Sequence, residues 1–110
     1  MSVVSGVASQ VQIFKRAGGY KVRPATLGAG RGTDVVFFNA TAVTVKLLFP
    51  VQIFEGVTSG SVSIAAGDSE RLTLLEHIAL GTYPYAVFWE ESGLRDFASG
   101  ESAPIIIIDR

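Results

Sequence analysis

The single histidine of the chain, His77, is the residue best suited to acid–base or metal chemistry. An imidazole titrates near neutral pH and binds divalent metals, so beside a carboxylate it could act as a general base or a ligand. The acidic residues that could join it are Glu76, Glu90, Glu91 and Asp96. A metal site needs several ligands that converge, and nothing in this spacing requires convergence. We therefore expect His77 to be an ordinary surface or capping histidine and keep a site of His77, Glu90 and Glu91 as the weaker alternative.

An adjacent acidic pair, Glu90 and Glu91, follows Val-Phe-Trp at the end of a predicted strand. Two carboxylates can bind a hard cation, but adjacent residues of a strand point to opposite faces and would not pair there. No serine stands in the spacing of a nucleophile elbow. The glycine-rich segment 28–32 leads into a strand rather than into the helix N-terminus that a phosphate cradle needs. The sequence therefore favours a non-catalytic protein over an enzyme.

The composition excludes several classes of partner. Nine basic and ten acidic residues are spread along the chain and give a net charge of −1. No basic stripe is present, so we expect neither nucleic acid nor a membrane surface as partner. The chain contains no cysteine, which excludes disulfides and thiolate metal sites.

The length of 110 residues predicts one domain over residues 1–110, and an apolar fraction of 48% with only 17% charged residues predicts that it folds. No apolar run approaches the ~20 residues of a membrane helix. Residues 1–12 lack a basic region before their apolar residues, so they do not resemble a secretory signal. We expect a cytoplasmic location unless a leader was trimmed.

The elements that must position these residues are mostly strands. Apolar and polar residues alternate with a period of two in segments 20–23, 43–47, 61–64 and 71–74, and glycine-containing turns separate them. We predict an all-β sandwich with at most a helical turn at residues 74–80 and at 93–98. The tetrapeptide Val-Gln-Ile-Phe occurs at 11–14 and 51–54, and we favour two strands of similar environment over a duplicated half-domain.

Five segments in order resemble the strands of the cupredoxins, the family of blue-copper proteins. They are residues 20–27, 32–39, 66–74, the run Gly-Thr-Tyr-Pro-Tyr-Ala-Val at 81–87, and 103–108. The resemblance covers nearly the whole chain and implies a Greek-key β-sandwich, cupredoxin-like, of about seven to eight strands.

The copper ligands of that family do not carry over. A blue-copper centre needs two histidines and a thiolate, usually with a weak axial methionine. The resemblance places the first histidine near Val43, the cysteine at Val87 and the second histidine near Glu90, and the only methionine is Met1. The resemblance therefore implies the architecture without a copper site, and we expect no metal and no cofactor.

Two rows of large apolar residues could form an interaction surface. In Ile105, Ile106, Ile107 and Ile108, alternation puts two side chains on the outer face, either the first and third or the second and fourth. A second row of Tyr83, Tyr85 and Trp89 shares a face with Val87 and suits either an interface or, the favoured interpretation, the core. Either the long connection 90–103 or the N-terminal ten residues fold over the outward isoleucines, or these residues form a protein interface, since extended exposed apolar patches mark interfaces.

Three functions remain open from the sequence. The favoured one is a non-catalytic, copper-free module that binds a protein partner or a second copy of itself through an outer sheet face. The second is a small hydrolytic or metal-dependent enzyme with a site near His77 and Glu90. The third is a carrier of a small apolar ligand held between the sheets.

Overall fold

The structure is a computed structural model that describes residues 9–16, 19–58, 60–91, 94–97 and 104–110. These residues contain eleven strands. In chain order they are β1 (Ser9–Arg16), β2 (Gly19–Arg23), β3 (Thr26–Ala29), β4 (Asp34–Asn39), β5 (Val45–Leu48), β6 (Ser61–Ile64), β7 (Ser69–Thr73), β8 (Gly81–Pro84), β9 (Ala86–Glu91), β10 (Leu94–Phe97) and β11 (Ile105–Ile108). Within these residues there is no helix that could cross a membrane.

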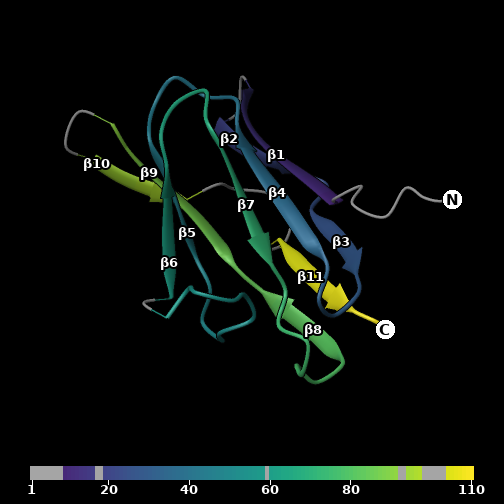
Figure 1. Cartoon of the computed structure of the whole chain (residues 1–110). Helices are drawn as coiled ribbons and strands as arrows, with labels where there is room; N and C mark the ends of the chain where they lie inside the picture. Colours follow the sequence, from purple (N-terminus) through teal and green to yellow (C-terminus); the bar gives the residue numbers. More distant parts are fainter. Residues whose placement is uncertain (1–8, 17–18, 59, 92–93, 98–103) are drawn as a thin grey trace, which may run out of the picture.

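The strands form two packed layers (Figure 1). The first layer is one sheet with the strand order β2-β1-β4-β7. The second layer consists of two sheets, β10-β9-β5-β6 and β3-β11-β8. Only Tyr85 separates β8 from β9, so one long run of chain belongs to both sheets of the second layer. Pairing is antiparallel except between β1 and β4 and between β3 and β11.

Alternating burial in the strands explains why the two layers pack. In β1 the side chains of Val11 and Ile13 are buried while those of Gln10 and Gln12 are exposed. The same pattern in β4, β5 and β11 sends every second apolar side chain into one core. Alternation of this kind is what a half-buried strand requires, because successive side chains point to opposite faces. The predicted all-β sandwich is confirmed.

Five aromatic contacts fill the middle of this core. The ring of Phe37 packs edge-on against those of Phe49, Phe54 and Tyr85, at centroid distances of 6.1, 6.0 and 5.8 Å. Phe49 also contacts Phe54 and Tyr85, at 5.1 and 5.6 Å. Edge-to-face pairs at these distances are favourable beyond the area that they bury. The interior between the layers is therefore closely packed.

The sandwich has more strands than the seven to eight expected, for three local reasons. The chain leaves the first layer after β2 and enters the second at β3, which divides one expected strand in two. The run from β8 to β9 is interrupted at Tyr85. The third addition is β10, which pairs antiparallel with β9.

Both predicted helical turns are wrong over the described residues. Leu94–Phe97 forms β10, because its backbone pairs with β9 rather than with itself. In segment 74–80, Leu74 forms an isolated bridge with Phe54 and the chain then turns toward β8. Apolar residues three apart suit a helical turn, but hydrogen bonds to neighbouring strands decide the conformation here.

Candidate functional site

The end of the sandwich where the resemblance places a metal is closed by a hydrogen-bond network around Asn39. This side chain is fully buried at the end of β4. Its Nδ2 donates to the backbone carbonyls of Val43 and Ile64 at 2.7 and 2.9 Å. Its Oδ1 accepts from the backbone N–H of Thr41 at 2.9 Å and from Thr41 Oγ1 at 2.6 Å. The amide thus ties the loop between β4 and β5 to β6 and uses its hydrogen-bonding capacity within the protein.

Copper does not fit the side chains at this end. Val87 is 1% exposed in the core, and Val43, half-buried in the loop, offers only an aliphatic side chain. Neither supplies the imidazole or thiolate that a blue-copper centre needs. Among the described residues no group of three or more histidine, cysteine, aspartate or glutamate side chains gathers to hold a metal ion. The side chains of Val43 and Val87 therefore lack the donor atoms of a blue-copper centre.

His77 and Glu90 lie at opposite ends of the sandwich. His77 is exposed in the loop that precedes Gly81, where β8 begins, whereas Glu90 is at the far end of β9 (Figure 1). A strand rises about 3.3 Å per residue, so the ends of the run from β8 to β9 are roughly 30 Å apart. The structure does not bring the two residues together. The side chains of Glu90 and Glu91 are outside the described part.

The closing strand β11 presents alternate isoleucines to the two sides of its sheet. Ile106 and Ile108 are in the core at 0% and 1% exposure, while Ile105 and Ile107 are half-buried on the outer face. Ile105 pairs with Pro84 of β8, whose side chain is exposed. The outward pair is thus the first and third of the four.

That outer face continues onto β9 and β5. Ala86 pairs with Leu48, and Leu48 remains 38% exposed. We call the set the isoleucine face and define it by Ile105, Ile107, Pro84, Ala86 and Leu48. These residues form an apolar part of the outer surface of the second layer.

Tyr83 and Tyr85, two of the three aromatic residues in the predicted row on β8 and β9, point toward the core. Tyr85 is 2% exposed and belongs to the aromatic core, so its ring is not available to a partner. Tyr83 is half-buried against the core and its hydroxyl donates to the Ala79 carbonyl at 2.6 Å. Trp89 lies in β9, and its side chain is outside the described part of the structure.

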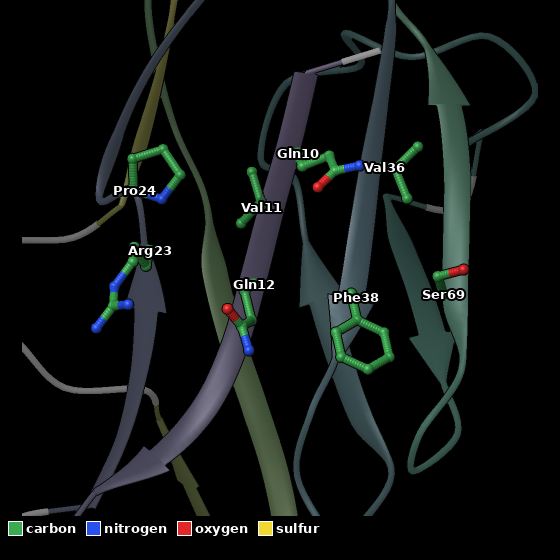
Figure 2. A pocket seen from close by; sticks show the side chains of 8 residues that line it. All are labelled: Gln10, Val11, Gln12, Arg23, Pro24, Val36, Phe38 and Ser69. Carbon is green, nitrogen blue, oxygen red and sulfur yellow. The ribbon is translucent and has the colours of Figure 1, made fainter. Parts of the chain in front are cut away.

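A second surface, which the sequence did not reveal, lies on the outer face of the first layer. Polar and aromatic side chains from its four strands line a hollow there (Figure 2). These residues are far apart along the chain, and only the pairing of strands brings them together. No motif in the sequence signals such a site.

The fold is shared with solved cupredoxin structures. The chain is similar to a novel purple cupredoxin from Nitrosopumilus maritimus, with 15% identity, a TM-score of 0.54, and coverage of 92% of this chain and 99% of that one. It is similar also to an oxidised amicyanin mutant, with 16% identity, a TM-score of 0.59, and coverage of 96% and 86%. A reduced Cu(I) form of another amicyanin mutant at pH 4 matches with a TM-score of 0.57 and 16% identity.

No family model matches the chain, and no curated protein sequence is similar to it. At 15–16% identity the structural matches establish the architecture alone, because one fold supports many unrelated functions. The chain has a cupredoxin-like fold without the copper ligands, as its strands and its vacated ligand positions predicted.

Proposed function

We propose that this chain is a non-catalytic binding module that associates with a protein partner, or with a second copy of itself, through the isoleucine face. One observation carries the proposal. Leu48, Ile105 and Ile107 stand on one outer face of the second layer, where alternation would normally place polar residues. An extended apolar patch on an outer face usually marks a surface that another protein covers.

The vacated metal end supports the non-catalytic part of the proposal. Asn39 satisfies its own hydrogen bonds within the fold, and Val87 fills the position of the thiolate. Neither side chain can take up a proton or bind a metal in this arrangement. These two residues therefore suit a binding module better than a catalytic site.

The test is the absolute mass in solution, measured by light scattering behind a sizing column over a hundredfold range of concentration. We expect a dimer at the highest concentrations that dissociates on dilution. Leu48→Glu should shift the protein to monomer, because it puts a charge within the apolar contact. Leu80→Glu is the matched control, since Leu80 is 56% exposed in the loop before β8 and outside the face.

A mass that is monomeric at every concentration would contradict self-association and leave a different protein as partner. Immobilised wild-type and Leu48→Glu proteins would then be compared for what they retain from a lysate of the source cells. A partner that both retain equally would contradict a role for the isoleucine face.

A further inference from the structure

Cross-strand register builds a row of side chains across the outer face of the first layer. Arg23 of β2 is opposite Gln12 of β1, Gln12 is opposite Phe38 of β4, and Phe38 is opposite Ser69 of β7. Neighbouring strands are about 4.8 Å apart, so the row is roughly 14 Å long. Figure 2 shows Gln12 between Arg23 and Phe38, with Ser69 on the far side of Phe38.

A shorter row lies beside the first, where Gln10 is opposite Val36. Together the two rows line a hollow of about 530 Å³, which lies within the range of small-molecule sites. We call it the β1–β4 hollow and define it by Gln10, Gln12, Arg23, Val36, Phe38 and Ser69.

The lining combines one exposed aromatic ring with groups that form hydrogen bonds. Phe38 is 40% exposed although it is large and apolar. The carboxamides of Gln10 and Gln12 both donate and accept, as does the hydroxyl of Ser69. These three side chains make no hydrogen bond to any described residue, so their capacity is available to a ligand.

The same face carries more cations than anions. The guanidinium groups of Arg23 and Arg16 lie over the ring of Phe14 at 4.8 and 5.8 Å from its centroid, and no described carboxylate pairs with either. The described strands of this layer contain two carboxylates: Asp34 is paired with Arg71 at 2.8 Å, and Glu70 is exposed on the edge strand β7. Among the described residues, Arg16 and Arg23 thus outnumber the exposed Glu70 on this layer, which favours anions near Arg23 although the chain has a net charge of −1.

We propose that the β1–β4 hollow binds an acidic saccharide, in which a sugar ring carries a carboxylate. The C–H edges of a pyranose stack on the face of Phe38, because the ring face is negative and the C–H groups are positive. Sugar hydroxyls, each a donor and an acceptor, match Gln10, Gln12 and Ser69. Arg23 binds the carboxylate through a charge-assisted hydrogen bond.

A peptide fits this face less well than a sugar. Peptides bind to sheets by adding a strand at a free edge or by laying a helix in an apolar groove. The hollow is centred on β1 and β4, whose backbones are already paired on both sides. One exposed ring among amides and hydroxyls matches a small polar ring better than an apolar helix. The site is on the opposite layer from the isoleucine face, so either proposal can fail alone.

Isothermal titration calorimetry with the full chain tests the proposal. The probes are an α-1,4-linked galacturonate tetramer and a hyaluronan tetrasaccharide. Maltotetraose is the uncharged control, and tetraglutamate is the anionic peptide control. We expect saturable binding of at least one uronate probe with one site per chain, weaker at higher salt. Maltotetraose and tetraglutamate should bind at least tenfold more weakly.

Variants locate the binding. Phe38→Ala and Arg23→Gln should each weaken uronate binding by about tenfold, through loss of stacking and of a charge-assisted bond. Gln12→Ala should weaken it several-fold, while Gln52→Ala, at an exposed glutamine in the loop after β5, should leave it unchanged. Thermal melts of each variant check that it is folded.

Two results would overturn the proposal. One is the absence of saturable binding of both uronate probes at millimolar concentration. The other is equal binding of tetraglutamate together with no effect of Phe38→Ala, which would identify an unspecific cationic surface. Both are independent of the oligomeric state that tests the isoleucine face.

Discussion

The ring of Tyr85 meets that of Phe37 edge-on in the core, at a centroid distance of 5.8 Å and an interplanar angle of 82°, yet its hydroxyl has no hydrogen-bond partner among the described residues. The aromatic contacts of Tyr85 are those that a phenylalanine would make. Its oxygen adds only the cost of removing a polar group from water. We therefore expect the Tyr85 hydroxyl to lower the stability of the fold.

Tyr85→Phe is expected to raise the free energy of unfolding by about 1 kcal/mol, because an unsatisfied buried donor is removed and the ring contacts are kept. Urea unfolding followed by circular dichroism measures the change. Tyr83→Phe is the matched control, since the Tyr83 hydroxyl donates to Ala79 and its removal should be neutral or slightly destabilising. A loss of 1 kcal/mol or more in Tyr85→Phe would show that a buried water satisfies the hydroxyl.

The same tyrosine makes stability sensitive to alkali. Burial raises the pKa of the Tyr85 phenol above its ordinary value of 10.0. The folded protein keeps the phenolic proton of Tyr85 above pH 10, whereas the unfolded chain loses it. The contribution of this protonated phenol to the free energy of unfolding is therefore complete below about pH 10 and is lost as the pH rises. Each pH unit there can cost up to about 1.4 kcal/mol. Urea unfolding at pH 8 and pH 11 should show a smaller loss for Tyr85→Phe than for wild type. Equal losses would contradict this assignment.

Asp34 is expected to contribute to stability against acid. The hydrogen bond from Thr73 Oγ1 at 2.7 Å, and then that from Arg71 Nη1 at 2.8 Å with its charge, lower the pKa of the Asp34 carboxyl. A lowered folded pKa gives stability that is present above about pH 4 and is lost as the pH falls through the folded pKa. Asp34→Asn should therefore flatten the decline in melting temperature between pH 5 and pH 2. Asp68→Asn, in the exposed turn between β6 and β7, is the control, and equal slopes in both would refute the role of Asp34.

Asn39→Asp is expected to destabilise the fold by about 3 kcal/mol or more, although it changes the shape of the side chain little. A carboxylate cannot donate to the carbonyls of Val43 and Ile64, and it would be a buried charge. Chemical unfolding at pH 7 measures the loss. The deficit should shrink at acid pH, where the introduced carboxyl takes a proton and can donate one bond. A variant within 1 kcal/mol of wild type at pH 7 would show that the network is dispensable.

The period-two pattern predicted most strands because the alternation of apolar and polar residues is visible in the local sequence. It could not predict β10, whose four residues are extended only because β9 pairs with them. The repeated tetrapeptide shows the same limit. In β1 it alternates, with Val11 and Ile13 buried. In the loop after β5, Val51 is 55% exposed and Phe54 is buried beside Ile53. Interpreting both copies as strands of similar environment was wrong, since tertiary contacts override the local sequence.

The candidate sites differ in how far the sequence predicts them. The loss of the copper ligands follows from residue identity, because the chain has no cysteine and only one histidine. The β1–β4 hollow joins Gln12, Phe38 and Arg23, which are adjacent only through strand register. Register depends on pairing between distant segments, and a single sequence does not specify it.

The parallel pairing of β3 with β11 has a consequence for how fast the chain acquires its structure. Thr26 pairs with Ile105, so about 80 residues separate the partners, and the entropy of closing such a long loop must be overcome before the contact forms. Until β11 pairs with β3 and β8, the backbone edges of these two strands that face it stay open to water and to other chains. We therefore expect the sheet β3-β11-β8 to assemble late, and folding on the scale of milliseconds to seconds is expected for this topology.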